Sequence, residues 1–285
     1  MSARMRALAK ETEEIVERGW YVTADGRRAE IGEAAGRARA RTRLHGPEPL
    51  PGTEPGPPPG AAPDAARTVV EVTDEGSLRA AHRLTRRAGL PVAVLNFASA
   101  RNPGGGYLNG AQAQEEALCR GSALYRCLRE VPEFYAAHRA DRSPFYSDRV
   151  IHSPGVPVFR DDAGTLLEAP FTADFLTCPA PNAGVVARRA PERSAEVPGV
   201  LRRRAGQVLR VAAASGARAL VLGAWGCGVF RNSPADVAAA FAAHLRGEGP
   251  LTGAFAHVTF AVLDRREPSP VREPFRALFG GAEPM

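Results

Sequence analysis

The segment from Asn102 to Glu116 combines a run of glycines with two adjacent carboxylates, and both features suit chemistry on a phosphorylated sugar. The glycines Gly104 to Gly106 follow the apolar run 92–97, and a backbone without Cβ atoms can approach a phosphate or a sugar closely. Glu115 and Glu116 come a few residues later, where a carboxyl group can reach the bond to be broken and act as a general acid. The segment therefore predicts a loop that binds a nucleotide-sugar and carries its own acid.

A second glycine-containing loop follows the buried apolar run 219–223. It contains Gly226, Cys227, Gly228, Val229 and Phe230. Ligands of open α/β sheets bind beyond the carboxyl ends of the strands, and the amides of glycine loops and helix N-termini attract phosphate oxygens. Two such loops side by side predict a site for a diphosphate. The alternative is that the glycines only turn the chain.

The two glutamates also have a purely structural interpretation. Acidic residues in the first turn of a helix complement the helix dipole, whatever the function. Neighbouring residues of a helix diverge by about 100°, so Glu115 and Glu116 are not expected to face one bond in the same way. We expect one of them to act on the bond and the other to orient the substrate.

Composition and spacing disfavour several other classes of protein. Neither Gly-x-Gly-x-x-Gly with a suitably placed acid nor Gly-Lys-Ser/Thr occurs, which argues against a dinucleotide-binding dehydrogenase and a P-loop ATPase. The four cysteines form no Cys-x-x-Cys pair and the six histidines no metal-binding pattern, so we expect neither a metal nor a cofactor. No run of 18 apolar residues and no signal-peptide core is seen, so we expect a cytoplasmic protein without a membrane partner. We also expect a monomer.

The formal net charge of +6 is carried almost wholly by arginine. Arginine grips phosphates with a planar fork, which weakly suits a polyanionic ligand. The same composition also fits a GC-rich coding bias. The basic segment Arg202 to Arg204 also has two interpretations. It could contact the phosphates of a polymer, or it could form a solvated helix face.

Strands and helices alternate from residue 67 onward, which predicts a three-layer α/β domain over residues 67–285. The expected strands are 68–72, 91–97, 150–152, 175–178, 219–223 and 257–263. The expected helices are 75–88, 114–130, 192–215, 234–246 and a terminal turn at 275–279. Residues 1–66 are expected to form an N-terminal helical extension that ends in a Pro/Gly-rich linker at 46–65.

These motifs resemble those of a known family. The residues Asn96-Phe97-Ala98, the glycines Gly104, Gly105 and Gly106, and Gln114-Glu115-Glu116 are similar to the Gly-Gly-Gly…Gln-Glu-Glu signature of poly(ADP-ribose) glycohydrolases. The resemblance is strongest to the short bacterial type, whose core is a macrodomain, and it covers about residues 68 to 265. It implies a macrodomain-like α/β/α fold with a mixed sheet.

The resemblance also implies an activity. The reaction would be hydrolysis of ribose–ribose O-glycosidic bonds in poly(ADP-ribose), from chain ends, with ADP-ribose as the product. Glu116 would be the catalytic acid/base, and Glu115 would bind hydroxyls at the scissile linkage. The implied substrate-binding residues are Asn102, Gly104, Gly105, Gly106, Gln114, Gly226, Cys227, Gly228, Val229 and Phe230, the last packing against the terminal ribose.

Three alternatives remain open at this stage. A binding module would read ADP-ribose without hydrolysing it, although it would not need the Glu115-Glu116 pair. A hydrolase of another ADP-ribosyl linkage, to protein or nucleic acid, would use the same grip on the diphosphate. An unrelated nucleotide-binding enzyme would require both glycine loops to match by chance.

Overall fold

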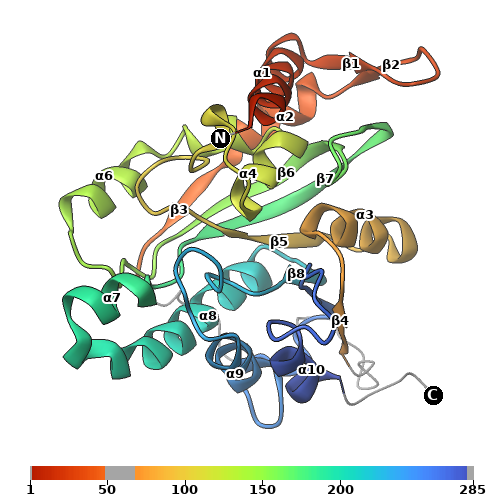
Figure 1. Ribbon diagram of the computed structural model, residues 1–285. Helices are drawn as coiled ribbons and strands as arrows, with labels where there is room; N and C mark the ends of the chain where they lie inside the picture. Colours follow the sequence, from red (N-terminus) through yellow and green to blue (C-terminus); the bar gives the residue numbers. More distant parts are fainter. Residues whose placement is uncertain (1, 49–67, 281–285) are drawn as a thin grey trace.

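The computed structural model describes residues 2–48 and 68–280, and its centre is a seven-stranded mixed sheet (Figure 1). The strands in sheet order are β3 (Arg43–His45), β6 (Val150–Arg160), β7 (Leu166–Cys178), β5 (Val92–Phe97), β8 (Ala219–Leu222), β9 (His257–Ala261) and β4 (Val69–Thr73). The pairs β3–β6 and β6–β7 are antiparallel, and the other four pairs are parallel. The predicted α/β class with a mixed sheet is confirmed.

Helices cover both faces of the sheet, as the alternation of side chains along β5 requires. Ala93 and Leu95 join the core beneath α7 (Ala183–Arg189), α8 (Val197–Ala214), α9 (Pro234–Leu245) and α10 (Glu273–Phe279). Val92 and Val94 join the core on the other face, which is covered by α1 (Ala3–Arg18), α2 (Gly32–Arg41), α3 (Ser77–Ala88), α4 (Gln114–Gly121), α5 (Leu124–Leu128) and α6 (Pro132–Ala140) (Figure 1). The strand β5 is thus buried on both faces, and its end is held firmly.

The N-terminal residues build part of this layer and one strand. The short strands β1 (Trp20–Val22) and β2 (Arg28–Glu30) pair as a hairpin beside α1, within the segment predicted to be a helical extension (Figure 1). Strand β3 then pairs with β6, so the predicted extension contributes an edge strand to the main sheet. The predicted linker at 46–65 lies, from residue 49, outside the described residues, and the domain boundary at residue 66 stays a prediction.

One predicted helix is wrong in its extent. Instead of a single helix over 114–130, α4 ends at Gly121, and α5 begins at Leu124. Ser122 forms a β-bridge with Val158, and the N–H of Ala123 donates to the Pro157 carbonyl at 3.1 Å. Pairing with β6 therefore interrupts the helix, which local sequence does not show.

The two short strands expected at 150–152 and 175–178 are longer in the structure and pair as the hairpin β6–β7. The first strand runs on to Arg160 and the second begins at Leu166, and a polar turn at 161–164 lies between them. A shift in register between Ser153 and Val156 accommodates Pro154 and Gly155, which had disguised the strand. The basic helix expected from 192 also begins later, at Val197, after the 3₁₀ segment η2 (Pro191–Glu196).

Within residues 2–48 and 68–280, we find no helix that combines the length and the apolar character needed to cross a membrane.

Candidate active site

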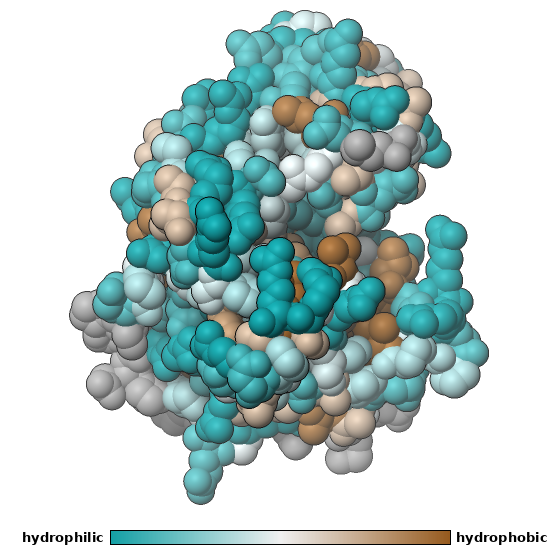
Figure 2. All heavy atoms as spheres, turned by 60° about the vertical axis from the view of Figure 1, so that its left-hand side comes forward, coloured by the Kyte–Doolittle hydropathy of each residue, from teal (hydrophilic) through white to brown (hydrophobic). Residues whose placement is uncertain are grey.

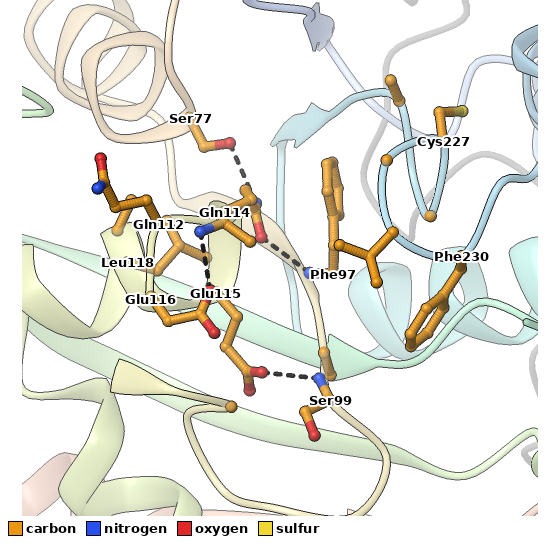
Figure 3. A pocket seen from close by; sticks show the side chains of 18 of the residues that line it. Ser77, Phe97, Ser99, Gln112, Gln114, Glu115, Glu116, Leu118, Cys227 and Phe230 are labelled. Carbon is orange, nitrogen blue, oxygen red and sulfur yellow. Dashed lines mark hydrogen bonds between the residues drawn. The ribbon is translucent and has the colours of Figure 1, made fainter. Parts of the chain in front are cut away.

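Both glycine loops open into one pocket at the carboxyl ends of β5 and β8, with a volume of about 1120 Å³. In the close view, α4 and its two glutamates lie on one side, the loop of Cys227 and Phe230 lies on the other, and Phe97 lies between them (Figure 3). Of the residues predicted for the site, those that line the pocket are Asn102, Gly105, Gly106, Gln114, Glu115, Glu116, Gly226, Cys227, Gly228, Val229 and Phe230. The fold thus brings together two segments that are separated by more than 100 residues in the sequence.

Gln114 fixes the start of α4 against the end of β5. Its carboxamide oxygen accepts the Phe97 N–H at 2.9 Å, and its nitrogen donates to the Ser77 hydroxyl at 3.1 Å (Figure 3). The same nitrogen donates to the Leu95 carbonyl at 2.8 Å. The side chain therefore bonds the backbone of β5 much as a neighbouring strand would. Both polar atoms of the carboxamide have protein partners, so in this geometry Gln114 positions the two glutamates that follow it.

The Glu116 carboxylate joins α4 to the triple-glycine loop. One oxygen accepts the Ala113 N–H at 3.0 Å, which closes a cap at the helix N-terminus, and the other accepts the Gly106 N–H at 2.8 Å. Gly105 lies directly against it: a Cβ there would be 2.5 Å from Glu116 Oε1 and 3.1 Å from Glu115 Oε2. Because Gly105 also has a φ of +57°, only glycine fits between the loop and the two carboxyl groups.

The Glu115 carboxyl is buried, with 3% of the residue exposed. Burial raises its pKa from 4.5 to about 8, against the opposing hydrogen bonds from the Ser99 N–H (2.7 Å) and the Asn96 amide (3.3 Å). Asn96 is itself buried and held by Thr177 at 3.1 Å. The raised pKa favours the protonated form of Glu115 at neutral pH, and in that form the carboxyl group can donate a hydrogen bond.

The three glycines and Asn102 have different positions. Gly104 is buried with a φ of +66°, and a Cβ there would be 2.8 Å from the Tyr125 ring, so this glycine allows close packing beneath the loop. Asn102 is exposed on the pocket wall, and its carbonyl accepts the Gly105 N–H at 3.0 Å. The pocket itself is lined by Gly105 and Gly106.

The second loop is more open than the first. Gly226 has a φ of +72° and lies against Asn232, whose amide donates to the Pro181 carbonyl at 2.8 Å and to that of Gly226 at 3.3 Å. Val229 is 83% exposed. Burial raises the pKa of the Cys227 thiol to about 12, so a thiolate nucleophile is not available at neutral pH.

The pocket also contains residues that were not among the predicted site residues. Phe97 and Tyr146 add aromatic walls, and the exposed Leu263 extends the apolar lining near Asp264 and Arg266. A space-filling view shows hydrophobic residues gathered beside a hollow on a mainly hydrophilic face (Figure 2). Phe97 was visible as the end of a buried strand, whereas nothing in the irregular segment around Tyr146 marks it.

The basic segment of α8 does not form a uniform solvated face. Arg204 is fully buried and donates to the Asp148 carboxylate and to the carbonyls of Pro179 and Phe145, each at 2.8 Å. Arg203 pairs with the same aspartate from a more exposed position. Arg204 is thus a structural residue that fixes the loop beside the pocket.

Fold and site define an α/β protein whose pocket sets two carboxyl groups against glycine loops, and comparison with known proteins identifies its family. The family model for the microbial-type poly(ADP-ribose) glycohydrolase (PARG) catalytic domain matches residues 9–161, more than half of the chain. The chain therefore belongs to the microbial-type PARG family. No match is found among the curated proteins.

Solved structures agree with this assignment. The crystal structure of PARG from Thermomonospora curvata is similar at 53% identity, with a TM-score of 0.91, over 98% of this chain and 100% of that chain. The structure of that enzyme bound to the inhibitor ADP-HPD matches at 50% identity with a TM-score of 0.86, over 97% and 99% of the two chains. PARG from Deinococcus radiodurans in complex with ADP-ribose matches at 48% identity with a TM-score of 0.76, over 85% and 96%.

Proposed function

We propose that this chain hydrolyses the ribose–ribose O-glycosidic bonds of poly(ADP-ribose) and releases ADP-ribose. The observation that carries the proposal is the Glu116 carboxylate, which the N–H groups of Gly106 and Ala113 fix beside the pocket into which both loops open. The relatives support the ligand, since one solved PARG holds ADP-ribose and another the inhibitor ADP-HPD.

In the proposed reaction, Glu116 starts as the protonated carboxylic acid and first acts as a general acid. It protonates the leaving ribose oxygen while the bond from that oxygen to the anomeric carbon breaks. Glu116 then accepts a proton from a water molecule, and the resulting hydroxyl adds to the anomeric carbon. The products are free ADP-ribose and a chain shorter by one unit, and Glu116 ends in its starting protonation state.

The second carboxyl group has a different task. Most glycosidases place two carboxylates on opposite sides of the scissile bond, roughly 5 to 9.5 Å apart. Glu115 and Glu116 both border Gly105 on one side of the pocket, so a partner is needed on the other side. The diphosphate of the substrate can stabilise the positive charge that develops on the ribose. Protonated Glu115 would bind a ribose hydroxyl and orient the sugar.

The products of the reaction test this proposal. Wild-type protein is incubated with purified poly(ADP-ribose), and the products are followed over time by chromatography and mass spectrometry. Action from chain ends predicts free ADP-ribose from the first time point, without short oligomers. Oligomers would show cleavage inside the chain. No release from the polymer, together with release from mono-ADP-ribosylated protein or nucleic acid, would move the protein to another ADP-ribosyl linkage. Binding without any release would make it an ADP-ribose reader.

We also propose that the protein acts in the cytoplasm as a monomer. Its four cysteines are free, three of them buried, which suits a reducing compartment. Sedimentation of the purified protein tests the oligomeric state.

A further inference from the structure

Two residues other than glycine adopt a left-handed backbone within the part of the chain that the structure describes, and both lie at the same wall of the pocket. They are Tyr146, with a φ of 60°, and Arg231, with a φ of 58°. Tyr146 lines the pocket, and Arg231 directly follows Phe230, which also lines it. A left-handed conformation is costly for such residues and persists only where the surrounding structure imposes it, often beside a ligand.

The side chains of Tyr146 and Phe230 meet at this wall. Their ring centroids are 5.9 Å apart, with an angle of 41° between the ring planes. Paired aromatic rings in contact have centroid separations of about 4.5–7 Å, so no sugar or base fits between these two. The rings therefore form one continuous aromatic wall that faces the cavity.

Buried side chains hold the backbone on both sides of Tyr146. The carbonyl of Phe145 accepts from Arg204 at 2.8 Å, and the N–H of Ser147 donates to His138 Nε2 at 3.2 Å. Arg204 and His138 are 0% and 2% exposed. Because both neighbours of Tyr146 bond buried side chains, these contacts impose the left-handed backbone between them.

The backbone around Phe230 is held in a similar way. Its carbonyl accepts the Gly184 N–H at 2.9 Å, and the Arg231 N–H donates to the Gly228 carbonyl at 3.1 Å. The aliphatic part of Arg231 packs against Gly184, where a Cβ would lie only 3.0 Å from the arginine Cδ. Both halves of the aromatic wall are thus preorganised by separate sets of contacts.

We propose that Tyr146 contacts the substrate and extends the aromatic surface of Phe230 along the same ribose. This inference rests on the proposed function, because it takes ADP-ribose as the ligand. A flat aromatic face suits the C–H edge of a sugar. Tyr146 is only partly buried and lines the cavity, so its side chain is accessible to a ligand. A rigid wall lowers the entropy cost of ordering the pocket on binding.

Three variants separate a contact with the ligand from a structural role. Y146A and Y146G both remove the ring, but only the glycine relieves the left-handed strain. Y146F keeps both the ring and the strain. Binding of ADP-ribose is measured by calorimetry and thermal stability by a melting curve, with polymer hydrolysis by wild type run in parallel. The proposal predicts about 10-fold weaker binding for Y146A and Y146G alike, and less than about 3-fold for Y146F. Y146G should melt about 2 °C or more above Y146A.

Two results would overturn the proposal. If Y146G binds ADP-ribose as wild type does, the ring does not contact the ligand. If affinity follows melting temperature across the three variants, Tyr146 acts only through the fold. Failure of the proposed function looks different, because wild type itself would then neither bind ADP-ribose nor release it from the polymer.

Discussion

The two glycine loops occupy equivalent places at the ends of β5 and β8, yet they use their backbone amides differently. In the first loop the protein's own groups accept from the amides: Glu115 from Ser99, and Glu116 from Gly106. The Gly105 amide donates to the carbonyl of Asn102. In the second loop, no acceptor among the described residues bonds the amides of Gly226, Gly228, Val229 and Phe230. The first loop thus fixes the two carboxyl groups for which we propose roles in catalysis, and we infer that the second loop holds the anionic part of the ligand.

The two loops therefore differ in which of their backbone amides are bonded within the protein, although both contain several glycines. Amides that already bond a carboxylate cannot also bind a phosphate, while unbonded amides in an exposed turn can. The following substitutions test the difference, beginning with the largest expected effect.

Replacing Gly105 by alanine should damage the first loop most. The new Cβ would displace both carboxyl groups, so we expect polymer hydrolysis to fall at least about 100-fold, since a small misplacement of reacting groups is costly. Gly155→Ala is the matched control, because Gly155 also has a positive φ, of 60°, but has no atom within 4 Å of a Cβ. It should lose about 1 kcal/mol of stability and keep its hydrolytic rate. Equal losses of activity in both variants would show that backbone strain, and not the contact with the carboxylates, is responsible.

The protonation of Glu115 makes stability depend on pH. Its pKa is about 8 in the folded protein, against 4.5 for an unperturbed glutamate, so the folded protein binds the proton more tightly than the unfolded chain does. The contribution of the protonated group is fully present below pH 4.5 and is lost as pH rises through 8. Glu115→Gln should therefore gain stability relative to wild type as pH rises from about 5 to about 9, by a few kcal/mol in urea unfolding. A difference between the two proteins that does not change with pH would contradict a buried, protonated Glu115.

Replacing Gly226 by alanine should affect the second loop alone. The Cβ would meet Asn232 and Ala180 at a φ of +72°, so the loop must shift and its free amides with it. We expect about 10-fold weaker ADP-ribose binding by calorimetry, the loss of roughly one hydrogen bond to a charged group. Gly216→Ala controls for strain, since Gly216 has a φ of +82° and open space around it, and it is not one of the pocket-lining residues. Unchanged affinity in Gly226→Ala would show that the second loop does not carry the ligand.

Local sequence signals predicted the parts of the fold that local forces determine. The strand β5 appears as a continuous apolar run because both its faces are buried, and Ser233 caps α9 as its position before Pro234 indicates. The two loops were found because glycines follow buried strands. The different bonding of their amides could not be predicted, since it depends on the side chain of Glu116. The end of α4 at Gly121 could not be predicted either, since it depends on pairing with β6. Tyr146 was missed because buried Arg204 and His138, distant in sequence, give it its conformation.

The most direct test of the account compares Glu116→Gln with wild type in two assays, release of ADP-ribose from poly(ADP-ribose) and calorimetric binding of ADP-ribose. Glutamine keeps the shape and an acceptor oxygen but cannot transfer the proton. The account predicts that hydrolysis falls by about 10²–10⁴-fold while the affinity for ADP-ribose changes less than about 3-fold. Glu115→Gln, measured alongside, should retain more activity than Glu116→Gln. Hydrolysis by Glu116→Gln at a rate within about 10-fold of wild type would contradict the role of Glu116 as the general acid. If hydrolysis were lost in Glu115→Gln alone, Glu115 would be the general acid and Glu116 would orient the sugar.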